Sequence, residues 1–347
     1  MDLQFYFKQA IVKKASDVHL VGGGAPYLRI DGQLVKLNDD IIDAQQLAEA
    51  IYGLLDQRLI EILQGNKDLD ISKTIGGGHF RINLHYQRGV LGLTARLISD
   101  VIPSPESIGL NKQLQRLAFL NDGFVLVVGP CGSGKSTTLA SLLGIINRER
   151  QGKIITIEDP IEYIFENDHC LIEQREIGID ANDFAVALKY VLRQDPNVIM
   201  VGEMRDNETI DAALTAAETG HLVFSTLHTG PAAESLSRIV SSFPAYQQGQ
   251  IATKLSLCLR AVISQRLLPA ASGGRVAARE IMFNTPAIAN LLRSQKPEQI
   301  SSIIQTSSRD GMITLNRSIE ELLASGQITP EVAKMYTRGD SGDSYWR

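Results

Sequence analysis

The feature that most constrains this chain is a glycine-rich loop between an apolar run and a helix-like stretch. Phe124–Val128 is short, apolar and rich in valine, which is typical of a strand buried on both faces. The loop reads Gly129-Pro130-Cys131-Gly132-Ser133-Gly134-Lys135-Ser136-Thr137, and Thr138–Leu143 has the pattern of the first turns of a helix. Strand, loop and helix in this order are the context that a phosphate-binding P-loop requires.

The residue types in this loop predict how it would hold a nucleotide. Glycines let the backbone turn its N–H groups toward phosphate oxygens, and the helix dipole behind them favours an anion. Lys135 is expected to reach the β- and γ-phosphates, and the Ser136 hydroxyl is expected to ligate Mg²⁺. The predicted nucleotide-binding residues of the loop are Gly129, Cys131, Gly132, Ser133, Gly134, Lys135, Ser136 and Thr137. The alternatives, a loop that merely turns the chain or a dinucleotide-binding turn, fit less well, the latter because the spacing is not G-x-G-x-x-G.

Composition limits the class of protein. At 347 residues the chain has room for two domains, and 44% hydrophobic with 21% charged residues is an ordinary soluble balance. The net charge of −5 and the lack of a basic cluster argue against nucleic acid as a partner. The three cysteines lie far apart, so neither a zinc site nor a disulfide framework is expected. Without a long apolar run or a signal peptide, we expect a cytoplasmic protein with only peripheral membrane contact.

Residues 1–100 have the pattern of a separate α+β domain. Arg81 and Arg96 lie within two apolar strand-like runs, where an arginine normally marks a half-exposed strand face with solvent or a local ion pair. The expected helices are Leu3–Ala15 and a single stretch from Asp43 to about Gln64, which a capping box with Gln46 would open. The expected strands are Asp17–Leu20, Tyr27–Ile30, Gln33–Leu37 after a turn at Asp31-Gly32, Phe80–Leu84 and Gly92–Ile98.

The rest of the chain has the pattern of a second, larger domain. We expect a linker and a short helix over 101–122, around Pro103-Ser104-Pro105, an ATPase domain over 123–337 and a disordered tail over 338–347. Strands and helices alternate after the P-loop, which indicates a parallel sheet covered by helices. The expected elements are Lys153–Glu158, Phe184–Arg193, Asn197–Val201, Asn207–Glu218 and His221–Thr226, and then mostly helices with one further strand over Arg275–Ile281.

Two acidic segments complement the P-loop. Glu203 follows the apolar run Val198–Val201, which is the form of a Walker B acid that holds Mg²⁺, in this case through water. Glu158, Asp159 and Glu162 cluster where another predicted strand ends. Ligands of open α/β sheets bind beyond the carboxyl ends of the strands, where both segments are expected. Surface acidity at a strand end is the alternative interpretation.

The histidines divide into one candidate pair and four others. His221 and His228 bracket a predicted strand, and His228 is the better candidate because it lies at the carboxyl end, where it could sense the γ-phosphate. His19, His79, His85 and His169 show no metal-ligand spacing, so no metal is assigned to them.

Taken together, the motifs resemble the family of secretion and type IV pilus ATPases, and within it the branch of retraction motors. The resemblance covers nearly the whole chain. Its motifs are Ala15-Ser16-Asp17-Val18-His19-Leu20, the P-loop, Ile157-Glu158-Asp159-Pro160-Ile161-Glu162, Gln174-Arg175-Glu176, Arg193-Gln194-Asp195-Pro196, Val201-Gly202-Glu203-Met204-Arg205-Asp206 and Ala216-Ala217-Glu218-Thr219-Gly220-His221.

The resemblance implies a fold and roles for individual residues. It implies a PAS-like N-terminal domain, a RecA-like ATPase domain and a ring of six subunits. Glu162 would be the catalytic glutamate and Glu203 the Walker B acid. His221 and His228 would form a histidine box near the nucleotide, and Arg81 and Arg96 would stabilise phosphate charge.

The resemblance also implies a function: an ATP- and Mg²⁺-dependent homohexameric motor that retracts type IV pili and supports twitching motility. Its expected partners are an inner-membrane pilus platform protein and, as a further candidate, a second retraction ATPase. The alternatives are a pilus assembly or type II secretion ATPase, a RecA-like nucleic-acid motor, and a ring component that binds ATP without hydrolysing it. Assembly and secretion members usually carry a tetracysteine zinc module and a longer N-terminal region, and this sequence shows neither.

Two departures from the family pattern concern single residues. Retraction motors carry a motif reading AIRNLIRE, and the corresponding segment here is Ala287-Ile288-Ala289-Asn290-Leu291-Leu292-Arg293-Ser294. Ala289 and Ser294 therefore stand where an arginine and a glutamate are usual, which raises the possibility that the protein assists another motor. Cys131 stands where threonine is usual. A thiol at a helix N-terminus can be reactive, and inert packing is the favoured interpretation.

Overall fold

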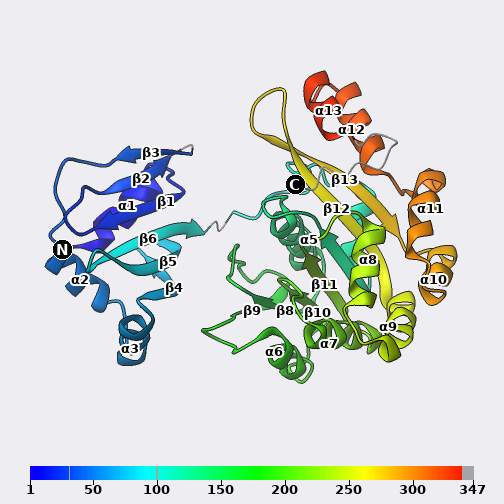
Figure 1. Ribbon diagram of the computed structural model, residues 1–347, viewed down its shortest axis with the longest axis horizontal. Helices are drawn as coiled ribbons and strands as arrows, with labels where there is room; N and C mark the ends of the chain where they lie inside the picture. The colour runs from blue at the N-terminus through cyan, green and yellow to red at the C-terminus, as the bar shows by residue number, and fades with distance from the viewer. Residues whose placement is uncertain (31, 99–100, 338–347) are drawn as a thin grey trace. The chain divides into compact units, whose positions relative to one another are not determined.

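The computed structural model describes residues 1–30, 32–98 and 101–337, and the predicted tail 338–347 lies outside them. The chain forms two compact units (Figure 1). The first comprises Met1–Val101 together with Glu162–Ile164, and the second comprises Ile102–Ile161 and the chain from Phe165 onward. In the described part of the chain, no helix combines the length and the hydrophobicity needed to cross a bilayer.

The first unit is built on an antiparallel six-stranded sheet in the order β3-β2-β1-β6-β5-β4. Its strands are β1 (Asp17–Val21), β2 (Tyr27–Ile30), β3 (Gln33–Lys36), β4 (Asp68–Ile75), β5 (Gly78–Gln87) and β6 (Val90–Ile98). Its helices are α1 (Leu3–Val12), α2 (Ala44–Tyr52) and α3 (Gln57–Asn66). All three helices contribute to one hydrophobic core with the sheet.

Alternation along the strands determines which side chains enter this core. In β5, Phe80, Ile82 and Leu84 are fully buried, and the Phe80 ring packs edge-on against Phe7 of α1 with centroids 4.6 Å apart. Arg81 lies between them in sequence and so faces the other side of the sheet. The strands that carry Arg81 and Arg96, β5 and β6, are antiparallel neighbours.

Two expectations for this unit are wrong or incomplete. The single helix predicted from Asp43 to Gln64 is two helices, because α2 ends at Gly53 and the Asp56 side chain caps α3 by accepting from Leu59 N at 2.9 Å. The expected cap at Asp43 is confirmed. Strand β4 was not expected, since half of its side chains are polar and exposed. Asp31 of the predicted turn lies outside the described residues.

The second unit contains a seven-stranded sheet in the order β13-β12-β7-β11-β10-β8-β9, parallel except for β13. Its strands are β7 (Gly123–Val128), β8 (Gly152–Glu158), β9 (Cys170–Glu176), β10 (Val198–Val201), β11 (Leu222–Leu227), β12 (Leu259–Pro269) and β13 (Arg275–Phe283). Its α-helices are α4 (Lys112–Gln115), α5 (Lys135–Glu149), α6 (Phe184–Val191), α7 (Asn207–Glu218), α8 (Ala232–Ser241), α9 (Ala245–Cys258), α10 (Pro286–Arg293), α11 (Ile300–Thr306), α12 (Leu315–Ala324) and α13 (Pro330–Tyr336).

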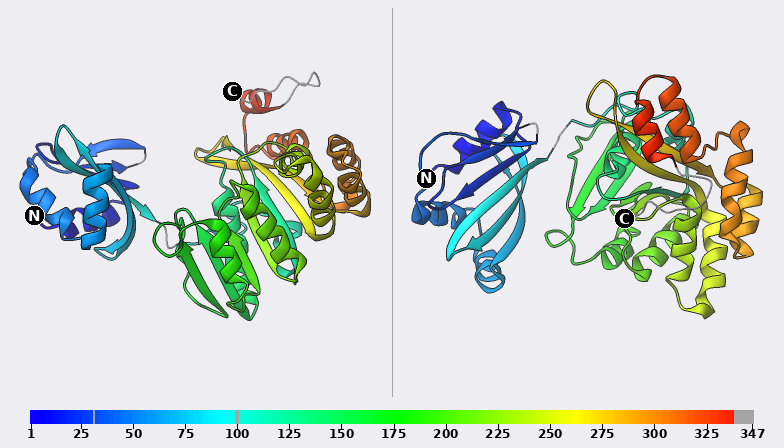
Figure 2. Two further views of the ribbon diagram at one scale, coloured as in Figure 1. Left: turned by 60° about the horizontal axis from the view of Figure 1, so that its bottom comes forward. Right: turned by 45° about the horizontal axis from the view of Figure 1, so that its top comes forward.

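Helices cover both faces of this sheet (Figures 1 and 2). Every residue of β7 is buried. Phe124, Leu126 and Val128 enter the core shared with α6 to α11, whereas Val125 and Val127 enter the core shared with α4 and α5. The apolar run before the P-loop is therefore a central strand, as its composition predicted, and the mixed α/β architecture is confirmed.

The sequence reading missed two strands in this unit. β12 falls in a stretch that was expected to be helical, because a continuous apolar run does not distinguish a buried strand from a buried helix. β9 is an edge strand with mostly half-buried residues, so it shows little apolar pattern. β12 matters for function because it runs parallel to β7 and places Gln265 behind the P-loop.

Candidate active site

The P-loop connects the carboxyl end of β7 to the first residue of α5. Gly129 (φ 148°) and Gly134 (φ 84°) adopt backbone conformations that favour glycine, and a Cβ on Gly129 would come within 2.3 Å of the Gln265 carbonyl oxygen. The first N–H groups of a helix have no partner within the helix, so the start of α5 is suited to an anion. The loop has the geometry of a phosphate cradle.

Lys135 is the first residue of α5 and is buried against this loop. Its Nζ donates to the carbonyl oxygens of Gly129 at 2.9 Å and of Pro130 at 3.0 Å. The ammonium group thus lies on the backbone of the loop that would surround a phosphate. It is placed to exchange these carbonyl oxygens for phosphate oxygens.

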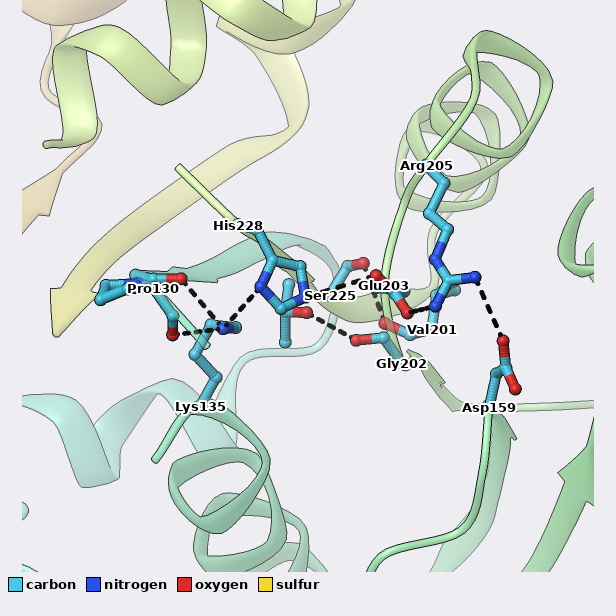
Figure 3. A network of polar contacts seen from close by, with 11 residues as sticks. Pro130, Lys135, Asp159, Val201, Gly202, Glu203, Arg205, Ser225 and His228 are labelled. Atoms are coloured by element: carbon cyan, nitrogen blue, oxygen red, sulfur yellow. Dashed lines mark hydrogen bonds and ion pairs between the residues drawn. The ribbon is translucent and has the colours of Figure 1, made fainter. Parts of the chain in front are cut away.

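His228 follows β11 and lies between Lys135 and Glu203 (Figure 3). Its Nδ1 is 3.4 Å from Lys135 Nζ, and its Nε2 is 3.4 Å from Glu203 Oε2. An ammonium group can only donate, so we assign Nδ1 as the acceptor and place the proton on Nε2, which donates to Glu203. Burial, followed by the charge of Lys135, lowers the pKa of His228, which favours this neutral tautomer.

Glu203 follows β10, and its other oxygen accepts from Arg205 Nη2 (Figure 3). Arg205 Nη1 lies 3.4 Å from Asp159 Oδ2, so one guanidinium group joins Glu203 to the acidic segment after β8. The hydrogen bond to Glu203 raises the pKa of Arg205. The sequence reading placed Arg205 in a family motif but gave it no role at the site.

The acidic segment separates into side chains with different surroundings. Glu158 is buried and its Oε1 accepts from Thr156 Oγ1 at 2.6 Å and Gln174 Nε2 at 3.1 Å. Such a carboxylate is held inside the fold. Glu162, four residues farther along, is exposed. Asp159 is one-third exposed and pairs with Arg205.

The structure does not bring His221 together with these residues. It precedes β11, and its backbone oxygen accepts from Gly123 N at the start of β7, whereas the P-loop follows the end of β7. Six residues of parallel strand separate the two edges, which corresponds to about 20 Å. The His221 ring instead contacts the Ala216 carbonyl oxygen. Of the two histidines only His228 lies at the carboxyl end of the strand, which is why the sequence favoured it.

Arg81 and Arg96 lie in the first unit on the solvent-facing side of its sheet, directly opposite each other on β5 and β6. Arg96 Nε donates to Asp17 Oδ1 at 2.9 Å, and the Asp17 side chain is only 6% exposed. Arg81 is 3.7 Å from Asp70. The expected local ion pairs are therefore present. A role for either arginine at a nucleotide stays a prediction.

The donor chemistry of the site fits a nucleotide bound with Mg²⁺. The Ser136 hydroxyl and the Glu203 carboxylate would supply the hard oxygen ligands that Mg²⁺ prefers. A cavity of about 280 Å³ adjoins Glu203 and His228, and Arg238 of α8 also lines it. The sequence reading did not single out Arg238.

Comparison with known proteins identifies the family to which this chain belongs. Residues 108–312 match the family described as type II/IV secretion system protein. The chain is 42% identical over 335 residues to the type IV pilus retraction ATPase PilT of Pseudomonas aeruginosa, covering 96% of this chain and 97% of that protein. It is 37% identical over 335 residues to the type IV pilus ATPase PilU of the same organism, covering 96% and 88%. A crystal structure of the pilus retraction motor PilT with bound ADP has a TM-score of 0.91 and 42% identity, with 98% of each chain covered.

Proposed function

Because this chain belongs to the type II/IV secretion system protein family, in the branch of the PilT and PilU ATPases, we propose that it is an ATP-hydrolysing motor that powers type IV pilus retraction. The observation that carries the proposal is the similarity to a retraction ATPase over nearly the whole length of both chains. The arrangement of Lys135, His228 and Glu203 around the P-loop supports the hydrolytic part. By retracting pili, the motor supports twitching motility.

The chain's own residues divide the work of hydrolysis. The P-loop amides and Lys135 bind the phosphates, and Ser136 and Glu203 would hold Mg²⁺, which would supply positive charge to offset the charge on the phosphate oxygens. Glu162 accepts a proton from the attacking water as general base. His228 loses its contact with Lys135 when the Lys135 ammonium group moves to a phosphate.

The proposed assembly is a homohexamer that works at the cytoplasmic side of the inner membrane as a peripheral protein. A pilus platform protein in that membrane is the proposed partner, and a second retraction ATPase is a further one. In the ring, Arg81 and Arg96 supply positive charge to the transferred phosphate. The net charge of −5 gives no support to a nucleic-acid motor.

Deleting the gene tests the direction of the motor. We expect the cells to keep or accumulate surface pili, to retract them poorly and to lose twitching, because assembly would continue without removal. Complementation with the parent gene should restore retraction, whereas Lys135→Ala should not. Loss of all surface pili after deletion would instead identify an assembly motor.

Purified protein should release phosphate from ATP, which distinguishes it from a ring component that binds ATP without turnover.

A further inference from the structure

A network of buried, hydrogen-bonded polar side chains lies behind the P-loop, on the side away from His228. Its centre is Gln265 of β12, which is 2% exposed. Gln265 Nε2 donates to the Ser133 carbonyl oxygen at 2.6 Å, and its Oε1 accepts from Thr138 Oγ1 at 2.9 Å. One amide therefore holds both the last turn of the loop and the first turn of α5.

Arg279 of β13 extends this network on the side of Gln265 that faces away from the P-loop. It stands directly opposite Gln265 in the β12–β13 pairing, and its Nε donates to Gln265 Oε1 at 2.8 Å. Its Nη1 and Nη2 donate to the carbonyl oxygens of Gly109 and Ile108, each at 2.8 Å. All three acceptors are neutral, although Arg279 is 5% exposed.

A buried cation without a carboxylate is unusual, since leaving water costs free energy that an opposite charge normally offsets. Burial lowers the pKa of Arg279 to about 10, so the guanidinium keeps its charge at neutral pH. Five fixed donors make arginine suited to joining several carbonyl oxygens at once. Its partners come from the segment before α4 and from β12, which points to a bracing role.

We propose that Gln265 and Arg279 are positioning residues that hold the P-loop in its nucleotide-binding shape and connect it to the segment at Ile108–Gly109. The proposal rests on the function proposed above. In a planar trans peptide the C=O and the following N–H point in opposite directions. Because Gln265 holds the Ser133 carbonyl oxygen, the Gly134 N–H points away from Gln265. Without this contact the Ser133–Gly134 peptide is free to rotate, and an amide is lost from the phosphate cradle.

Two substitutions test whether Gln265 and Arg279 position the P-loop, with equilibrium binding of ADP and Mg²⁺ to the full chain as the measurement. Gln265→Ala removes all three hydrogen bonds of the amide, to Ser133, Thr138 and Arg279. Arg279→Lys keeps the charge but loses the fork of donors. A hydrogen bond contributes about 0.5–1.5 kcal/mol net, so we expect each to raise the Kd for ADP about 3- to 10-fold. Because the residues act in series, the double variant should bind about as weakly as the weaker single variant. In steady state the KM for ATP should rise more than kcat falls.

Matched controls separate positioning from a general loss of stability. Leu268→Ala, also in β12, opens a cavity in the core formed with α12 and α13, so it should lower the melting temperature and leave the Kd unchanged. Arg275→Gln at the exposed start of β13 should change neither. An unchanged Kd in Gln265→Ala, or an equal change in Leu268→Ala, would overturn the inference. Failure of the parent protein to bind ADP would instead reject the proposed function.

Discussion

Nδ1 of His228 lies 3.4 Å from Nζ of Lys135, so the P-loop lysine and the histidine after β11 form a direct donor–acceptor pair. Protonation of His228 would remove the acceptor and place two cations side by side. A phosphate would draw Lys135 away from Nδ1. The pair therefore gives His228 a direct means of responding to the phosphate site.

The first prediction concerns pH and stability. Burial and the charge of Lys135 lower the pKa of His228 in the folded protein from its ordinary value of 6.5. The unfolded chain then binds more protons than the folded chain just below pH 6.5, so stability falls as pH decreases from there through the lowered pKa. We expect urea unfolding of the ligand-free protein to show a larger stability loss between pH 7.5 and 5.5 than unfolding of His228→Gln. His169→Gln, which removes an exposed imidazole outside the site, should behave like the parent.

The second prediction concerns the general base. Glu162 is exposed, whereas Glu158 is buried and hydrogen-bonded to Thr156 and Gln174. Glu162→Gln should lower kcat by about 10²- to 10⁴-fold with little change in the Kd for ATP, since general-base assistance is typically of that size. Lys135→Ala should instead weaken binding. Hydrolysis near the parent rate in Glu162→Gln would assign the role to another acid, with Asp159→Asn as the next variant to assay.

The sequence predicts most of the phosphate-binding half of the site, because a P-loop is local in sequence. Glu203 and His228 follow strands directly, Lys135 begins the helix after the loop that follows β7, and the parallel sheet brings these strand ends together. Contacts between distant segments could not be predicted in this way. The hydrogen bond between Gln265 and Arg279 requires β12, which was expected to be helical. The ion pair between Arg205 and Asp159 requires that β8 and β10 be neighbours in the sheet.

The third prediction concerns Arg96 and the carboxylate that holds it. Asp17 occupies Arg96 Nε, yet the Arg96 side chain remains 71% exposed. Arg96→Ala should reduce kcat strongly without unfolding the protein, because an arginine on a transferred phosphate contributes roughly 10³- to 10⁵-fold. Asp17→Asn should reduce kcat less in the parent and not at all in an Arg96→Ala background. ATPase assays with melting temperatures measure both.

Two outcomes would contradict this prediction in different ways. Unchanged turnover in Arg81→Ala, in Arg96→Ala and in the double variant would leave these arginines as ordinary residues of a solvent-facing sheet. Equal losses from Asp17→Asn in both backgrounds would show that Asp17 acts on the fold rather than through Arg96. The Arg29 side chain, 3.8 Å from the same carboxylate, provides a matched control as Arg29→Ala.

The fourth prediction uses the cysteine of the P-loop. Cys131 is exposed, whereas Cys170 and Cys258 are buried, and burial raises the pKa of Cys258 to about 12. A thiol-reactive probe should therefore modify Cys131 alone in the folded protein, as measured by mass spectrometry of peptides. ADP with Mg²⁺ should slow this labelling, because a phosphate in the loop would cover the thiol. Labelling at the same rate with and without saturating ADP would contradict the placement of the nucleotide at this loop.

The last prediction concerns the helix that departs from the retraction pattern. In α10, Ile288 is fully buried and Leu292 is 2% exposed, so the apolar side of the helix packs into the core. Thr285 caps the helix by accepting from Ile288 N. Ala289 is half-buried and Ser294 is exposed just after the helix ends. The two positions that lack the usual charges therefore lie outside the core.

Because folding does not depend on those positions, restoring the charges should change coupling to a partner rather than catalysis. We expect Ala289→Arg combined with Ser294→Glu to keep the ATPase rate within about twofold and the melting temperature nearly constant, since surface substitutions usually change stability by less than 0.5 kcal/mol. In cells the same variant should change retraction force or the dependence on a second motor. Force measurements on single pili, with and without that second motor, would measure both quantities. The exposed pair Gln295→Glu and Lys296→Arg is a control beside the helix. A large change in ATPase rate, or identical retraction in all strains, would contradict a coupling role for this surface.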